Sequence, residues 1–225
     1  MPKFSNVGTS VTSRHAMPPG MPETLSNRKP RNIVTPRGRG ARGYFPSRKS
    51  PKPLKYESLI ECDVLRTLEI ATLPKVLATQ PCVLNLQDGD TTFRYTPDIE
   101  VETERARFFV EVKHTEFLDD ADHAAKLRKI VQGMRSAGLV LVPILCRDVR
   151  ENDLQRELEI LIRERPAPRR YRGDIDAGVW DPFGRVVPSK EFSERWSEAK
   201  RICDELLRRL MRRDPDELFP VDSHR

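Results

Sequence analysis

Hydrophobic residues recur at helical spacing in four stretches of the chain. In the first stretch Ile60, Val64 and Leu68 fall on one side of a helix, and Pro74 follows as a terminator. Gly138 provides a similar stop after the second stretch. Each pattern predicts an amphipathic helix with one buried face. These helices are expected at residues 56–70, 119–137, 151–164 and 189–213.

Short runs of β-forming residues separate the first two helices, and one longer apolar run separates the second from the third. Asp88, Gly89 and Asp90 mark a turn between two of the short runs. The longer run, Leu139–Cys146, is typical of a strand buried on both faces. The order helix, three strands, helix, strand, helix predicts a mixed α/β layered fold. The short strands are expected at Cys82–Leu86, at Thr92–Tyr95 leading into Ile99–Val101, and at Phe108–Val112.

Positive charge is concentrated near the start of the chain. Residues 1–50 hold ten Lys or Arg and one acid, Glu23, whereas the other 175 residues hold 30 basic and 33 acidic residues. This segment is rich in Pro, Gly, Ser and Arg and lacks a hydrophobic period, so we expect it to be disordered when free, with order beginning near Leu54. A basic arm neutralises DNA phosphates largely without reading sequence. A solubilising leader is the alternative.

The composition divides the chain into three parts: a disordered basic arm at 1–50, an α/β body at 51–165, and a helical C-terminal extension at 166–225. Pro166 and Pro168 mark the linker before the extension. The long helix of the extension has an apolar stripe and ends in arginines, which suit the negative end of a helix dipole. Two interpretations stay open for it: packing on the body, or docking to a partner or to DNA.

The four cysteines, Cys62, Cys82, Cys146 and Cys203, lie far apart and form no CxxC pair. This spacing predicts reduced thiols rather than a zinc site or a disulfide framework. No apolar run reaches the ~20 residues of a membrane span, and the start of the chain lacks the apolar block of a secretion signal. We therefore expect a cytoplasmic protein that does not enter a membrane.

One arrangement of charged residues stands out on the predicted strands. Glu111 and Lys113 alternate with valines, so both should project from one face of a strand while Val112 faces the core. If the preceding strand forms a hairpin that turns at Glu104-Arg105, positions whose numbers sum to 209 face each other. Asp98 then lies opposite Glu111, and the two carboxylates and the amine share one cluster.

Such a cluster can cleave a phosphodiester. Acidic oxygens hold a divalent cation, the cation activates water, and a cation or amine stabilises the developing charge. Mg²⁺ prefers one or two carboxylates in such sites, and Mn²⁺ can take its place. Asp98 and Glu111, with the carbonyl of Val112, would hold the ion, while Lys113 would orient water and stabilise the phosphorus. A surface hairpin with ordinary charges is the alternative.

Two glutamates of the first predicted helix, Glu57 and Glu61, are one turn apart and should point the same way. Either could add a metal ligand or orient the water, and both could instead be solvated charges. His114 is expected to pack or form hydrogen bonds rather than act as a base. Lys126 and Lys129 of the next helix could touch phosphates or form a solvated face. The patterns Pro215-Asp216 and Glu198-Ala-Lys200 repeat parts of the motif in the wrong order, so we do not expect them to form a site.

Several short motifs follow one another along residues 45–165: Ser47-Arg-Lys49, Tyr56-Glu-Ser-Leu-Ile-Glu-Cys-Asp63, Leu68-Glu69, Gln80-Pro81, Tyr95-Thr-Pro-Asp98 and Glu111-Val-Lys113. Taken together, they resemble the motifs of the TnsA-like transposon endonucleases, a group within the PD-(D/E)xK superfamily. The resemblance covers roughly residues 45–165 and implies a restriction-endonuclease-like mixed sheet flanked by helices.

The resemblance implies Mg²⁺-dependent cutting at the 5′ ends of a transposon, beside a TnsB-like partner transposase that acts on the 3′ ends. The helix glutamate of the family falls best on Glu61, with Glu57 second; Asp98 and Glu111 match its metal-binding acids and Lys113 its lysine. Many relatives carry Arg at Cys62. Two other functions stay open: a PD-(D/E)xK nuclease of phage processing, repair or defence, and a catalytically silent DNA-binding adaptor.

Overall fold

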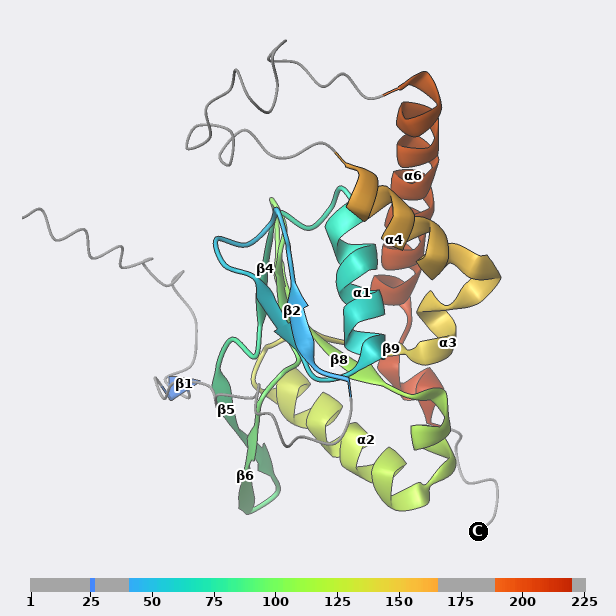
Figure 1. The fold of residues 1–225 in the computed structure, drawn as a ribbon. Coiled ribbons are helices and arrows are strands. Elements are labelled where there is room, and N and C mark those ends of the chain that lie inside the picture. Colours follow the sequence, from blue (N-terminus) through green and yellow to red (C-terminus); the bar gives the residue numbers. More distant parts are fainter. Residues whose placement is uncertain (1–24, 27–40, 166–188, 220–225) are drawn as a thin grey trace, which may run out of the picture.

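The computed structural model describes residues 25–26, 41–165 and 189–219. Most of the expected arm and the linker after residue 165 lie outside these ranges. The described chain forms a mixed α/β fold of sheets and helices (Figure 1). Its elements are β1 (Leu25–Ser26), β2 (Gly43–Phe45), β3 (Leu54–Tyr56), α1 (Leu59–Ile70), β4 (Val76–Thr79), β5 (Val83–Asp88), β6 (Thr91–Tyr95), β7 (Ile99–Glu102), β8 (Arg107–Lys113), η1 (Thr115–Asp119), α2 (Ala121–Ser136), β9 (Leu141–Leu145), α3 (Cys146–Val149), η2 (Glu151–Asp153), α4 (Leu154–Glu164), α6 (Lys190–Arg212) and η4 (Pro215–Leu218).

The central sheet has the strand order β4-β7-β8-β9. Neighbours are antiparallel except β8 and β9, which run parallel and are joined through α2. Ile99 pairs with Val110 and Glu102 with Arg107, so the numbers of paired residues sum to 209 as the sequence predicted. The expected hairpin register is confirmed. Alternation along β8 excludes a slip of one residue, which would turn every buried valine to the other face.

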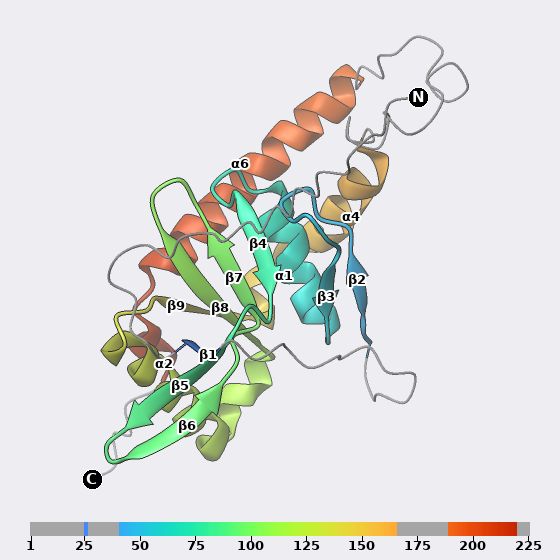
Figure 2. The ribbon, with the colours of Figure 1, turned by 90° about the vertical axis from the view of Figure 1, so that its left-hand side faces the viewer.

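Both faces of the central sheet are covered. Phe108, Val110 and Val112 pack in one cluster with α1, α4 and α6, whereas Phe109 packs in a second cluster with α2 and the β5–β6 ribbon. All of β9 is buried, which confirms the expectation of a strand covered on both sides. In Figure 2 the β5–β6 ribbon stands apart from the central sheet and lies near α2. The two faces therefore carry different layers.

The expected strand from Thr92 to Val101 is two strands in two sheets. β6 pairs with β5, whereas β7 pairs with β4 and β8. The break falls at Pro97, which lacks the N–H that a continuing ladder needs. β4 was not predicted. The chain therefore leaves one sheet and enters another beside Asp98.

Order begins earlier than expected. Tyr44 lies opposite Lys55 in a β2–β3 hairpin, and Phe45 is buried, so the predicted boundary near Leu54 is wrong. Ser47 donates a hydrogen bond to Glu69 at 2.6 Å, and the Lys49 ammonium donates to the carbonyls of Leu68 and Ala71. These bonds tie residues 47–49 to the end of α1.

Helix α6 packs on the body. Ala199, Cys203 and Leu207 are buried in the same cluster as α1. The Asp204 carboxylate accepts hydrogen bonds from Thr72 N–H at 2.7 Å and from its hydroxyl at 2.5 Å. These bonds satisfy a donor just after α1 and join segments far apart in sequence. Of the two interpretations offered for this helix, the structure shows packing on the body.

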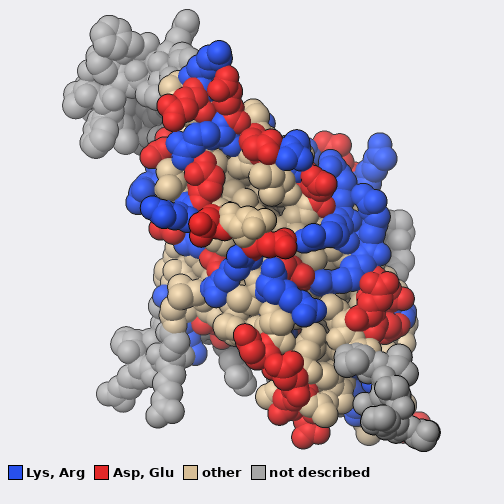
Figure 3. Space-filling view, turned by 90° about the vertical axis from the view of Figure 1, so that its right-hand side faces the viewer, with Lys and Arg blue, Asp and Glu red and all other residues tan. Residues whose placement is uncertain are grey.

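Acidic and basic side chains interleave over the face that α6 and α4 present (Figure 3). Arg195 binds Glu157 through two hydrogen bonds of 2.8 and 3.0 Å, and Arg201 bridges two glutamates of its own helix. This face is thus laced by ion pairs rather than uniformly basic. Within the described ranges, no helix combines the length and apolarity needed to cross a lipid bilayer.

Candidate functional site

The hairpin register brings the predicted acids together. One step beyond the Ile99–Val110 pair, Asp98 comes opposite Glu111. The Asp98 carboxylate accepts a hydrogen bond of 2.7 Å from Val112 N–H, which holds it against the end of β8. Asp98 is partly buried and Glu111 is only 4% exposed. The two carboxylates therefore lie near one another on the face of the sheet that carries Phe109.

Glu111 has two partners at short distance. Its Oε2 accepts a hydrogen bond from the Tyr95 hydroxyl at 2.5 Å, and its Oε1 lies 2.5 Å from the Lys113 ammonium. The same ammonium lies 3.3 Å from the carbonyl of Val112 and 5.4 Å from the centre of the Phe117 ring. Lys113 thus occupies the centre of the cluster. It is bound to Glu111 and faces an aromatic ring.

The charges of the cluster perturb one another. Burial, and then the charge of Glu111, raise the pKa of Asp98 well above its usual value, although Lys113 acts in the opposite sense. Burial lowers the pKa of Lys113, but the charges of Glu111 and Asp98 outweigh it and leave that pKa raised. Burial, and then Glu111, also raise the pKa of Tyr95, so the phenol keeps its proton and donates it in the bond to Glu111.

Glu61 lies at the start of α1, within electrostatic reach of the cluster. Burial raises its pKa, and Lys113 is among the charges that act on it. Ser58 caps the helix by accepting from Glu61 N–H, and its hydroxyl donates to the Glu61 carboxylate at 3.0 Å. This pair resembles a capping box. Glu61 therefore stabilises the start of the helix through its contacts, and its link to the cluster is electrostatic.

Glu57 is not on the helix, contrary to prediction. It precedes the cap Ser58, and its N–H donates to the other oxygen of Glu61 at 2.8 Å. Its carboxylate accepts a bond of 2.5 Å from the Gln80 side chain. Gln80 has a left-handed backbone (φ 46°), and its N–H donates to the carbonyl of Asp98 at 2.9 Å. Gln80 thus links Glu57 to the strand entrance beside Asp98.

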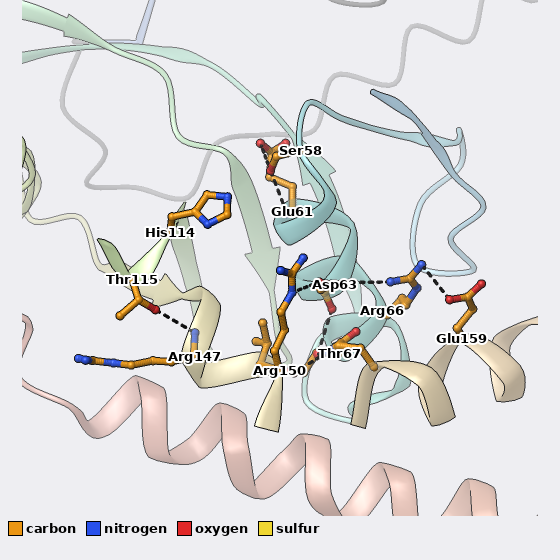
Figure 4. Close-up of polar contacts among 12 residues, drawn as sticks. Ser58, Glu61, Asp63, Arg66, Thr67, His114, Thr115, Arg147, Arg150 and Glu159 are labelled. Carbon is orange, nitrogen blue, oxygen red and sulfur yellow. Dashed lines mark hydrogen bonds and ion pairs between the residues drawn. The ribbon is translucent and has the colours of Figure 1, made fainter. Parts of the chain in front are cut away.

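A second polar network holds the start of α1 (Figure 4). Asp63 is buried and binds Arg66 at 2.5 Å and Arg150 at 2.7 Å, which joins α1 to the residue after α3. His114 is exposed, and its ring lies 3.6 Å from Glu116 rather than from a group of the cluster. This position gives His114 no contact with Glu111 or Lys113 in the described residues, as expected for a histidine that does not act as the base. The network fixes the helix that carries Glu61.

In the described part of the chain, no set of three or more His, Cys, Asp or Glu side chains is gathered closely enough to hold a metal ion. Glu111 contacts Lys113 and Tyr95 instead. The donor chemistry nevertheless suits a hard cation: the carboxylates of Asp98 and Glu111, the Val112 carbonyl and the nearby Glu61 are all oxygen donors. The Lys113 ammonium contacts Glu111, and the charges of Asp98 and Glu61 also act on it, so acidic groups outnumber this amine.

Sequence reasoning gave no role to Tyr95, Gln80 or Phe117. The first two lie in motifs that carry the family resemblance, Tyr95-Thr-Pro-Asp98 and Gln80-Pro81, and only that resemblance could have pointed to them. No sequence pattern pointed to Phe117, because its contact with Lys113 depends on the turn of η1 after β8.

The four free cysteines agree with the predicted thiols; Cys62 and Cys203 are buried. No known family model matches the chain, and no curated protein matches it.

Proposed function

We propose that this protein is a metal-dependent DNA endonuclease with a restriction-endonuclease-like fold, and that it serves as the 5′-cutting subunit of a heteromeric transposase. One observation carries the nuclease proposal. Asp98, one residue before β7, lies opposite Glu111 of β8, and Glu111 contacts Lys113 at the end of the same strand. The assignment to a transposase rests on the combined motifs of residues 45–165 and on the basic arm.

Asp98, Glu111 and the Val112 carbonyl would hold Mg²⁺, or Mn²⁺ in its place, and Glu61 would complete the ligand set. When bound, the cation would activate water and offset the charge of the scissile phosphate. Lys113 would donate to the phosphate or to the water once freed from Glu111. Tyr95 holds Glu111 in place through its hydroxyl, and Val112 N–H does the same for Asp98.

The partners follow from the same reasoning. The basic residues of the segment 1–50 supply phosphate contacts that any DNA sequence can satisfy. Recognition of transposon ends then belongs to a TnsB-like transposase, which would also cut the 3′ ends and join them. A two-subunit enzyme of this kind can be silent until both subunits are present.

The chain offers matched controls for the test. Asp98→Asn and Lys113→Ala remove the proposed chemistry. Asp216→Asn and Lys200→Ala alter the two motifs that occur in the wrong order, Pro215-Asp216 on η4 and Glu198-Ala-Lys200 on α6. All four variants should be assayed with Mg²⁺ on DNA that carries transposon ends, in the presence of a TnsB-like transposase. We expect the first pair to lose at least 100-fold in cutting, about 2.7 kcal/mol of barrier, and the second pair to cut normally. Wild-type cutting by folded Asp98→Asn protein would refute the nuclease proposal.

Metal binding gives a readout that does not require cutting. Titration of the wild-type protein with Mn²⁺ in a calorimeter should release heat that Asp98→Asn lacks and Asp216→Asn retains. If wild type and Asp98→Asn bind Mn²⁺ alike, the assigned ligand set is wrong.

A further inference from the structure

A groove of about 580 Å³ opens beside the candidate site, between the β5–β6 ribbon and α2. Glu111 and Lys113 line it together with the aromatic and aliphatic residues Phe93, Leu127 and Ile130. Leu127 and Ile130 are buried and Phe93 is partly buried, so the groove has an apolar floor. The groove therefore joins an apolar surface directly to the reactive cluster.

Aromatic rings stand at this groove in a connected arrangement. The rings of Phe117 and His123 are stacked, with centroids 4.5 Å apart and planes 15° from parallel. The Lys113 ammonium lies over the Phe117 ring. The His123 side chain is 55% exposed, whereas Phe117 is partly buried. His123 therefore presents ring surface to solvent while Phe117 connects it to Lys113.

The charges along α2 change from one end to the other. Near its start, Asp120 caps the helix and accepts from His123 N–H at 2.9 Å, so negative charge surrounds the histidine. One turn further, Lys126 is exposed and has no ion-pair partner among residues the structure describes. Lys129 reaches across to Asp88 of the ribbon at 2.9 Å. A phosphate is thus favoured beside Lys126, and an uncharged ring is favoured beside His123.

We propose that this groove binds an unpaired nucleotide of the DNA strand being cut, with its base stacked on His123 and its phosphate beside Lys126. The inference rests on the proposed nuclease function and adds the form of DNA that the site accepts. Bases inside a duplex are already stacked on their neighbours, so an exposed ring gains a partner only from a base that has left the stack. Aromatic rings combined with basic side chains are the usual means of holding single strands.

The proposal predicts a preference for DNA with unpaired bases. Binding should be measured by fluorescence anisotropy in EDTA, with the full chain and at raised salt, where phosphate contacts of residues 1–50 are weakened. The probes are a fluorescent duplex and the same duplex with a short single-stranded overhang. We expect tighter binding of the overhang, about tenfold weaker binding of the overhang by His123→Ala, and near wild-type binding by His123→Phe, since stacking on one ring is worth about tenfold or more.

Two further variants test the phosphate contact. Lys126→Ala should weaken binding of the overhang probe and flatten its dependence on salt by about 0.7 in logarithmic slope, with little effect on the duplex probe. Lys200→Ala, on α6, is the matched control and should change neither value. The side chain of His123 does not take part in the cap of α2, which uses its backbone N–H, so His123→Ala should keep the fold, and circular dichroism checks this.

A crosslink gives an independent readout. A 5-iodouracil in the overhang should crosslink on irradiation to His123 or Phe117, as identified by mass spectrometry of the peptides. Equal binding of the two probes, wild-type binding by His123→Ala, or a crosslink confined to other residues would each overturn the inference. All of these measurements proceed without cutting. Wild-type cutting by folded Asp98→Asn protein would therefore refute the nuclease proposal without changing the measured binding of the unpaired nucleotide in the groove.

Discussion

Replacing Asp98 by Asn should stabilise the metal-free protein while it abolishes cutting. Burial and the charge of Glu111 raise the Asp98 pKa, which means that the folded state disfavours its charged form. Asparagine keeps the shape and an oxygen that can accept from Val112 N–H, now 2.7 Å away. The variant also reduces the cluster from three carboxylates facing one ammonium to two.

Two opposing effects set the magnitude. A neutral acceptor in place of a charged one weakens the bond to Val112 by about 1 kcal/mol. Relief of an unfavourable charge belongs to the substitutions that add about 0.5–2 kcal/mol. We expect a net gain of at most about 1 kcal/mol, equivalent to at most roughly 2–4 °C in Tm for a protein of this size.

The pH dependence has a definite sign. Because the folded pKa of Asp98 lies above its ordinary value of 3.8, the folded state binds more protons than the unfolded state between the two values. Stability of the wild type should therefore fall as pH rises through that window, and the fall should be smaller in Asp98→Asn.

Urea unfolding followed by circular dichroism measures both effects, in EDTA and across pH. Asp216→Asn is the control: it removes an exposed ion pair with Arg135 and should change stability by less than about 1 kcal/mol. A folded Asp98→Asn protein that is less stable than the wild type at neutral pH, with unchanged pH dependence, would refute the electrostatic reasoning about the cluster.

Three other substitutions test separate parts of the structure. Tyr95→Phe removes the hydroxyl that holds Glu111, so cutting should fall about tenfold, or about 1.4 kcal/mol, while DNA binding in EDTA stays unchanged. Asp204→Ala leaves Thr72 and Leu73 N–H groups without their acceptor and should cost about 3 kcal/mol in urea unfolding. Burial lowers the pKa of Lys49 to about 8, so the unfolded state binds more protons above that pH. Wild-type stability should therefore gain up to about 3 kcal/mol between pH 8 and 10.5 relative to Lys49→Met.

Long-period patterns allowed the sequence to predict much of the fold. The four amphipathic helices appear close to their expected positions, because each repeats its apolar face over several turns. The hairpin register was a supposition about a turn at Glu104-Arg105, which no Gly or Asn marks, and the pairing of β7 with β8 confirms it. Alternation along β8 keeps Val110 and Val112 in the core, but it limits the pairing only to registers two residues apart. The position of the turn then selects the register that brings Asp98 opposite Glu111.

What the sequence could not predict depends on contacts between distant residues. Asp204 bonds to Thr72 across 132 positions, and Lys49 bonds to carbonyls at the end of α1; neither leaves a local pattern. The β2 strand was missed because its three residues are too short for a detectable period. Glu57 was placed on the helix because spacing alone cannot show that Ser58 is the cap.

Excess charge is what separates this cluster from an ordinary ion-pair network. Elsewhere in the described chain, the buried Asp63 forms ion pairs with both Arg66 and Arg150, so two cations balance one acid. At the candidate site the balance is reversed: the ammonium of Lys113 contacts Glu111, and the charges of Asp98 and Glu61 also act on it. A fold selected only for stability gains nothing from this, since each extra carboxylate raises the pKa of its neighbours. A divalent cation would offset the repulsion between these carboxylates, and the proposed nuclease would act with such a cation bound.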